Sequence, residues 1–117
     1  MPRKRRRISA ETAAVLSLFI QHRERVFYGL EVVREAAVAS GSVYPILIRL
    51  ETRGILASRL EDEDEAAAEG RRPRRYYRLT DHGARVATED LDEWYAEERR
   101  RAQRRGGVLW VPGAVAR

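Results

Sequence analysis

The apolar positions along the first half of the chain fall into blocks that predict three helices. The centre of the segment 9–23 is apolar on nearly every side, so we expect this helix to be covered on both flanks. The segments 30–39 and 42–53 instead carry apolar residues at spacings of three and four, which is typical of helices with one buried face. The positions expected to point inward are Leu30, Val33, Ala37 and Val38 in the second helix and Val43, Ile46, Leu47 and Leu50 in the third.

Capping residues and one proline set the expected ends of these helices. Ser9, together with Thr12, can cap the first helix. Proline lacks an N–H and is tolerated in the first turn of a helix, so the position of Pro45 indicates that the third helix begins at Ser42. Gly54 is placed to end this helix, because glycine readily adopts a positive φ.

The second half of the chain predicts a β-hairpin and a long helix. The segments 55–60 and 75–79 have the composition of strands, and the stretch 61–74 between them shows no buried pattern, so we expect a flexible tip there. Thr80 can cap a last helix over residues 81–105. Its apolar positions are Val86, Leu91, Trp94 and Tyr95. A basic arm, 1–8, precedes these elements, and a tail, 106–117, follows them.

This order of elements is that of a winged helix-turn-helix domain. We expect a mainly α fold with a small β-hairpin, in which the domain spans residues 9–80, the wing spans 55–79, and 81–105 form one C-terminal dimerisation helix. The helix 42–53 suits the major groove of DNA, which is about 12 Å wide and admits one α-helix. With its apolar stripe turned inward, the residues left to face DNA are Ser42, Tyr44, Pro45, Ile48, Arg49 and Arg53.

Two of these residues have specific expected roles. Arg49 is the best candidate for reading a base, because a guanidinium can pair bidentately with guanine. Ser42 and the free amides at the helix start can bind a phosphate.

Composition narrows the class of protein further. The chain has 117 residues, 23 Lys+Arg against 18 Asp+Glu, a formal charge of +5 and no cysteine, which excludes disulfide scaffolds and cysteine chemistry. His22 and His82 have no companion ligands or nucleophile, so we expect no metal, no cofactor and no enzymatic activity. No apolar run is long enough to span a membrane, so we expect a cytoplasmic protein without a membrane partner. Arg5 and Arg6 of the basic arm are expected to contact nucleic acid.

Four segments in matching order resemble the PadR-like winged-helix transcriptional regulators. They are 27–31 (FYGLE), 41–51 (GSVYPILIRLE), 53–56 (RGIL) and 74–83 (RRYYRLTDHG). The resemblance implies a dimeric DNA-binding repressor of the family's shorter branch, whose C-terminal helix packs against the partner's first helix. It also implies that Arg75 and Arg78 lie near backbone phosphates, while Tyr77 and Leu79 anchor the wing. The dimer interface implied in this way consists of Leu16, Phe19, Ile20, Leu91, Trp94 and Tyr95.

The leading hypothesis is therefore a sequence-specific, homodimeric regulator, expected to repress, that reads a pseudopalindromic operator with the helix 42–53. Its two recognition helices would lie about one helical turn apart, ~34 Å. An alternative is a non-enzymatic basic module that binds protein or RNA through the same fold. A third hypothesis adds a small hydrophobic effector at the dimer interface near Phe19, Leu91 and Trp94.

Overall fold

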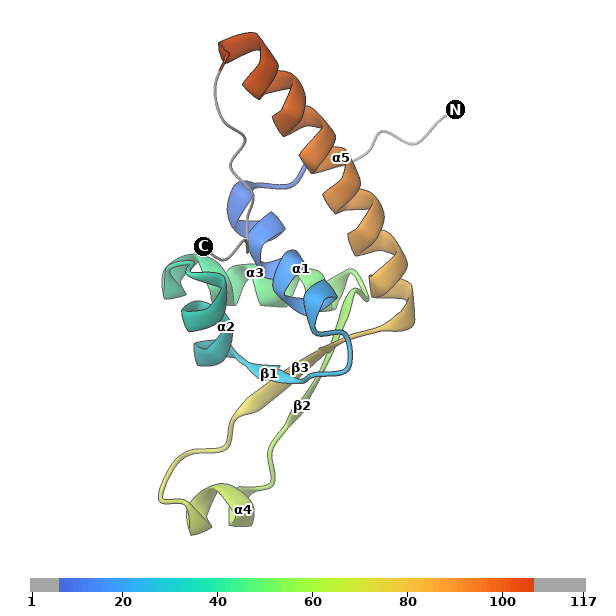
Figure 1. Cartoon of the computed structure of the whole chain (residues 1–117). Helices are drawn as coiled ribbons and strands as arrows, with labels where there is room; N and C mark the ends of the chain where they lie inside the picture. The colour runs from blue at the N-terminus through green and yellow to red at the C-terminus, as the bar shows by residue number, and fades with distance from the viewer. Residues whose placement is uncertain (1–6, 107–117) are drawn as a thin grey trace.

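The elements follow one another as three helices, a hairpin and a long last helix, with one short strand between the first two helices. Figure 1 shows this computed structural model, which describes residues 7–106; Arg5, Arg6 and the tail from residue 107 on lie outside the described residues. The elements are α1 (Ala10–Gln21), β1 (Phe27–Tyr28), α2 (Gly29–Ala36), α3 (Ser40–Thr52), β2 (Leu56–Leu60), α4 (Glu63–Ala68), β3 (Arg75–Leu79) and α5 (Asp81–Arg105). The expected mainly α fold with a small β-hairpin is confirmed, and β1 adds a third strand to the hairpin.

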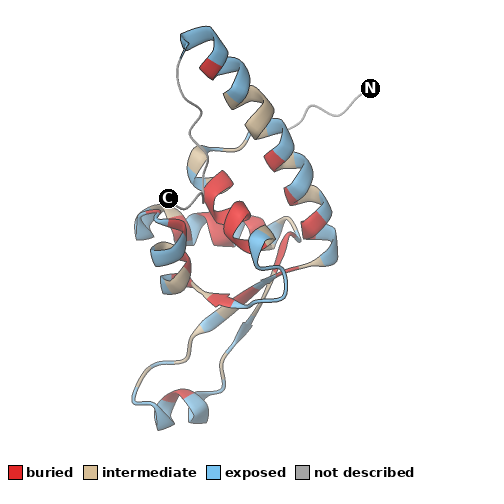
Figure 2. Ribbon diagram, in the orientation of Figure 1, coloured by how far each residue is buried: buried red, intermediate tan, exposed pale blue. Residues whose placement is uncertain are grey.

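Helix α1 lies at the centre of the core. The hydroxyl of Ser9 accepts a hydrogen bond from the amide of Thr12, as the capping pattern predicted. Every residue from 13 to 19 is buried, which Figure 2 shows as a continuous red segment. Helix α5 packs along α1 as far as its middle, where the side-chain oxygens of Ser17 and Tyr95 lie 3.3 Å apart. The chain therefore covers both flanks of its own first helix.

The sheet has the strand order β1-β3-β2, and all pairs are antiparallel. Strand β1 is not among the elements predicted from the sequence, because a two-residue strand is too short to show any periodicity. Phe27 pairs with Tyr77 and buries its ring against Phe19, with 5.1 Å between the ring centroids. The pairing fixes the chain direction just before α2 begins.

The buried face of α2 is not the one predicted. Val32 and Ala36 are buried, whereas Leu30 is 47% exposed and Val33 only partly buried. Both pairs of positions satisfy a helical spacing, so periodicity cannot choose between them. The helix also ends three residues earlier than expected, at Ala36, and its C-cap Ala37 has a left-handed φ of 55°.

Helix α3 begins at Ser40, two residues before the predicted start at Ser42. Its N-cap is Ala39, whose carbonyl accepts from the amides of Ser42 and Val43. Pro45 is therefore the sixth helical residue, inside the helix, and it cannot donate to the carbonyl of Gly41 four residues earlier. Gly41 and Pro45 are both exposed, so water can satisfy that carbonyl. Gly54, with φ of 76°, ends the helix as predicted.

The wing consists of β2 and β3, near their predicted bounds, with a short helix at its tip. We had expected a flexible tip with no buried position, but α4 occupies part of it, and its Ala66 is fully buried. Asp62 caps α4 by accepting from the amides of Asp64 and Glu65. Six residues are too few to show a helical period, so this helix had no signal except its cap.

Helix α5 starts against the base of the wing. The hydroxyl of Thr80 accepts from the amide of Gly83 at 2.8 Å and donates to the carbonyl of Gly54 at 2.7 Å, so the predicted cap also ties α5 to the end of α3. The second half of α5 extends beyond the rest of the domain (Figure 1). Gly106, with φ of 66°, ends it.

Candidate nucleic-acid interface

The surface of α3 opposite the core forms a ridge without charge. The buried positions Val43, Ile46, Leu47 and Leu50 occupy one side of the helix. The helical period places four exposed residues on the other side, and we call these the outward ridge: Gly41, Pro45, Ile48 and Thr52. Ile48 is 60% exposed, the largest exposed fraction among the large hydrophobic residues of α3. An apolar ridge of this kind can contact the methyl groups of thymine.

One flank of the ridge, the wing flank, carries Tyr44 and Glu51. The ring of Tyr44 is 43% exposed and lies on the backbone of Gly29 at the start of α2. Glu51 accepts a hydrogen bond from the hydroxyl of Ser58 on β2, and this hydroxyl accepts from the guanidinium of Arg75 on β3. This series of polar contacts fixes the wing relative to α3. The pKa of Tyr77 is raised by burial and, to a smaller extent, by the charge of Glu51.

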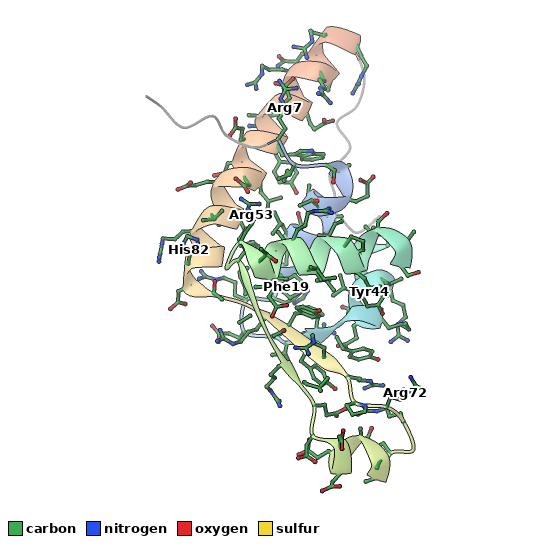
Figure 3. The ribbon with its side chains drawn as sticks, turned by 180° about the vertical axis from the view of Figure 1, so that it is seen from behind. Arg7, Phe19, Tyr44, Arg53, Arg72 and His82 are labelled. Atoms are coloured by element: carbon green, nitrogen blue, oxygen red, sulfur yellow. The ribbon has the colours of Figure 1, made fainter. Side chains whose placement is uncertain are left out.

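The other flank, the α1 flank, carries Arg49 and Arg53. Arg53 reaches Asp90 of α5 at 3.4 Å, while the exposed Arg49 forms no ion pair with any of residues 7–106. Figure 3 shows Tyr44 and Arg53 toward opposite ends of α3. Between this flank and the start of α1 lies a hollow of about 270 Å³, lined by Arg7, Ile8, Ser9, Thr12, Ile46, Arg49, Leu50 and Arg53.

The expected phosphate contact by amides at the helix start needs correction. Because α3 begins at Ser40, the amides of Ser42 and Val43 already donate to Ala39. Ser42 is only partly exposed. The amides that lack a partner in the helix belong to its first two residues instead.

The two wing arginines singled out from the sequence lie on opposite faces of β3. Successive strand residues alternate between faces, so Arg75 shares its face with Tyr77, and Arg78 shares the other with Tyr76. Only Arg75 is linked to α3, through Ser58. The two arginines therefore lie on different sides of the wing.

The outer face of the sheet carries a cluster that sequence reasoning missed. The rings of Tyr28 and Tyr76 meet edge to face at 5.9 Å, and the guanidinium of Arg74 lies 4.0 Å from the centre of the Tyr28 ring. Arg34 donates to the hydroxyl of Tyr28 at 2.9 Å. The only signal for this cluster would have been the pairing of β1 with β3, which two residues cannot reveal.

The wing tip is acidic and lies at the end of the hairpin away from α3 (Figure 1). Glu61 pairs with Arg71 at the base of this tip, and Arg71 also reaches Glu69 at 3.0 Å. The hydrogen bond from Arg71 lowers the pKa of Glu61 to about 2. The acidic side chains of α4 are thus held apart from the outward ridge.

The predicted dimer residues divide into two groups. Leu16 and Phe19 are fully buried and Leu91 is 5% exposed, so these three belong to the core of the chain itself and offer no surface to a second copy. For the same reason, Phe19 and Leu91 offer no surface to the small effector that was expected beside them. The other three expected interface residues are partly exposed: Ile20, Trp94 and Tyr95.

Across residues 7–106, no three histidine, aspartate or glutamate side chains gather as a metal site would require. Within the same residues, no helix combines the length and apolar character of a membrane span.

Known proteins resemble the chain both in sequence and in fold. Residues 22–89 match the model of the "Transcriptional regulator PadR-like family". A PadR family transcriptional regulator from Eggerthella lenta is 29% identical, with a TM-score of 0.62 over 80% of this chain and 82% of its own. A PadR family regulator from Clostridium difficile is 19% identical, with a TM-score of 0.64 over 85% of this chain and 100% of its own. A PadR-like regulator from Bacillus cereus is 21% identical, with a TM-score of 0.60 over 83% of this chain and 92% of its own. No curated protein matched the chain.

Proposed function

The chain belongs to the PadR-like family of transcriptional regulators, and from this premise we propose that it is a sequence-specific regulator whose α3 enters the major groove of DNA. The observation that carries this proposal is the outward ridge of α3. It is exposed along its length, has no charge of its own, and has guanidinium groups beside it on the α1 flank. A helix that reads bases needs this combination of close approach and positive charge at its side.

The roles of individual residues follow from their place around α3. Pro45 and Ile48 on the ridge are proposed to contact thymine methyl groups. Tyr44 on the wing flank and Arg75 on the wing are proposed to contact the DNA strand that borders the groove on that side. The sequence-based prediction that Arg49 reads guanine stays untested, and its place on the flank rather than the ridge also suits contact with the backbone.

We further propose that the regulator is a homodimer that acts as a repressor. The second half of α5 projects beyond the domain, where a second copy can reach it (Figure 1). Ile20, Trp94 and Tyr95 lie partly exposed along α1 and α5, and the rings of Trp94 and Tyr95 pack edge to face at 5.3 Å. In a two-fold dimer the two α3 helices would read half-sites about 34 Å apart, and occupancy of such a site would block transcription.

Selection of bound fragments from a random DNA pool by the purified full chain tests the proposal. We expect the selected fragments to contain two inverted half-sites, and to bind more tightly than bulk DNA or RNA by a factor of about 10³ or more. Light scattering of the complex should give two chains per duplex. Equal binding to all duplexes and to RNA would instead indicate a general basic module and would refute the regulator.

A further inference from the structure

We propose that the hollow between α1 and α3 binds one phosphodiester of the DNA backbone beside the groove that α3 enters. This inference rests on the proposed function and assigns Arg49 to the backbone rather than to a base. The hollow has two walls, the start of α1 with Arg7 and the second half of α3 with Arg49 and Arg53.

The charge of the hollow suits an anion. None of its eight lining residues is acidic, and three of them carry guanidinium groups. Asp90 faces Arg53 at 3.4 Å, which offsets part of one charge. The carboxylate of Glu97 on α5 attracts the charge of Arg7, but this carboxylate also forms an ion pair with Arg100 at 2.7 Å. Arg49 has no such acidic partner among the described residues and keeps its donors available.

The floor of the hollow strengthens binding of an anion. Ile46 and Leu50 are 3% and 2% exposed and present no competing acceptor. Hydrogen bonds from the guanidinium groups to a bound anion would be charge-assisted, and such bonds are stronger than those between neutral groups. At the rim the hydroxyls of Ser9 and Thr12 lie 3.0 Å apart at the start of α1.

The position of the hollow favours a backbone phosphate over other anions. Arg49 and Arg53 lie on the α1 flank, directly beside the outward ridge. When the ridge faces the bases, this flank faces the sugar–phosphate strand that borders the groove. Arg7 is also the last residue of the basic run 3–7, so the arm joins the domain where the backbone would pass.

The proposal is tested with the selected operator, in which single phosphates are replaced in turn by neutral methylphosphonates. We expect one replacement beside each half-site to weaken binding of the parent chain about tenfold, and to weaken binding of Arg49→Ala by a clearly smaller factor. Arg49→Ala should reduce the log–log salt slope by about 1 on every duplex and leave the base preference unchanged. Arg7→Ala should behave in the same way.

Controls separate this proposal from folding and from the proposed function. Arg23→Ala, an exposed arginine just beyond the other end of α1, should keep the parent's affinity and salt slope, and all variants should melt at the same temperature. A relaxed preference at one base pair in Arg49→Ala, with additive methylphosphonate effects, would make Arg49 a base reader and overturn the phosphate site. A parent that selects no sequence refutes the proposed function alone, since the salt slope on random DNA still tests the hollow.

A second arm distinguishes DNA from a free anion. Inorganic phosphate is titrated into the DNA-free protein while the amide signals of Ser9 and Thr12 are followed by NMR. Weak binding at these amides that Arg49→Ala removes, together with the methylphosphonate effect, supports a backbone site. Phosphate binding without any methylphosphonate effect would assign the hollow to a small free anion and overturn the proposal.

Discussion

The ring of Tyr44 lies so close to the backbone of Gly29 that a Cβ on that glycine would stand 2.4 Å from Cε1 of the ring. The glycine opens α2, whereas the tyrosine flanks the outward ridge of α3. The absence of a side chain at Gly29 therefore sets the position of an aromatic ring at the candidate DNA interface. Because the ring is half-exposed, it can swing away when the space is taken.

Gly29→Ala should lower DNA affinity with little cost in stability. We expect the methyl group to displace the Tyr44 ring and weaken operator binding about tenfold, roughly the value of one modest contact. The free energy of unfolding should change by less than about 1 kcal/mol, since the clash is with the far end of a movable side chain and alanine favours helix. Fluorescence anisotropy and urea denaturation measure the two quantities.

A double-mutant cycle gives the control for this prediction. In a Tyr44→Ala background the added methyl group has no ring to displace, so Gly29→Ala should have no further effect on affinity. Independent, additive losses would show that the glycine acts through something other than the ring.

Pro45→Ala should stabilise the protein and weaken its DNA binding. The alanine restores an N–H that can donate to the carbonyl of Gly41, and it removes a proline from a helix interior. Allowing for the greater freedom of the unfolded chain, we expect a gain of about 2 kcal/mol in the free energy of unfolding. Pro45 lies on the outward ridge, so affinity for the operator should fall. Unchanged stability in urea denaturation would mean that α3 already accommodates the proline without cost.

The helix start and the helix face that were predicted wrongly both depend on packing and pairing that local sequence rules do not capture. The ends marked by Ser9, Thr80 and Gly54 were predictable, because caps and positive φ act within a few residues. The predicted start of α3 was wrong. The rule that confines proline to the first turn placed the start at Ser42, but the helix packs on the core with Pro45 inside it. The buried face of α2 depends on β1 pairing with β3, a contact between segments about 50 residues apart.

The candidate site was predictable in part for the same reason. The exposed side of α3 follows from its buried stripe, so Tyr44, Pro45 and Ile48 were identified correctly as outward. The hollow beside Arg49 needs α1 and α3 to pack together, and the contact of Arg75 with Ser58 needs the hairpin register. Neither the packing of α1 on α3 nor the hairpin register can be predicted from the local sequence.

Gly83→Ala should be strongly destabilising. A Cβ at this position would stand 2.0 Å from the carbonyl oxygen of Ile55, which is backbone and also accepts from the amide of Thr80. The start of α5 would have to move off the wing, at an expected cost of about 2–3 kcal/mol in the free energy of unfolding. Gly41→Ala is the matched control, because nothing lies within 4 Å of its Cβ, and it should stabilise by about 0.5–1 kcal/mol. Similar urea midpoints for both variants would contradict this account.

The two wing arginines should differ in their effect on DNA binding. Arg75 lies on the face of β3 linked to α3, so Arg75→Ala should reduce operator affinity and lower the log–log salt slope by about 1. Arg78→Ala removes a guanidinium that is also exposed, but from the opposite face, and should cost less. Anisotropy titrations at several salt concentrations measure both. A larger loss for Arg78→Ala would show that the outer face of the sheet is the one that meets DNA.

The ion pair at the base of the wing tip should make part of the stability depend on pH. Arg71 lowers the pKa of Glu61 from 4.5 to about 2, so the carboxylate stabilises the folded state fully above about pH 4.5, and this contribution is lost as the pH falls toward 2. Glu61→Gln should therefore be less stable than the parent at pH 6, and the difference should shrink between pH 4.5 and 2. Urea denaturation across that range measures it. Glu63→Gln, which removes an exposed carboxylate but breaks no ion pair among residues 7–106, is the matched control. A difference for Glu61→Gln that stays constant with pH would rule out the ion pair as its cause.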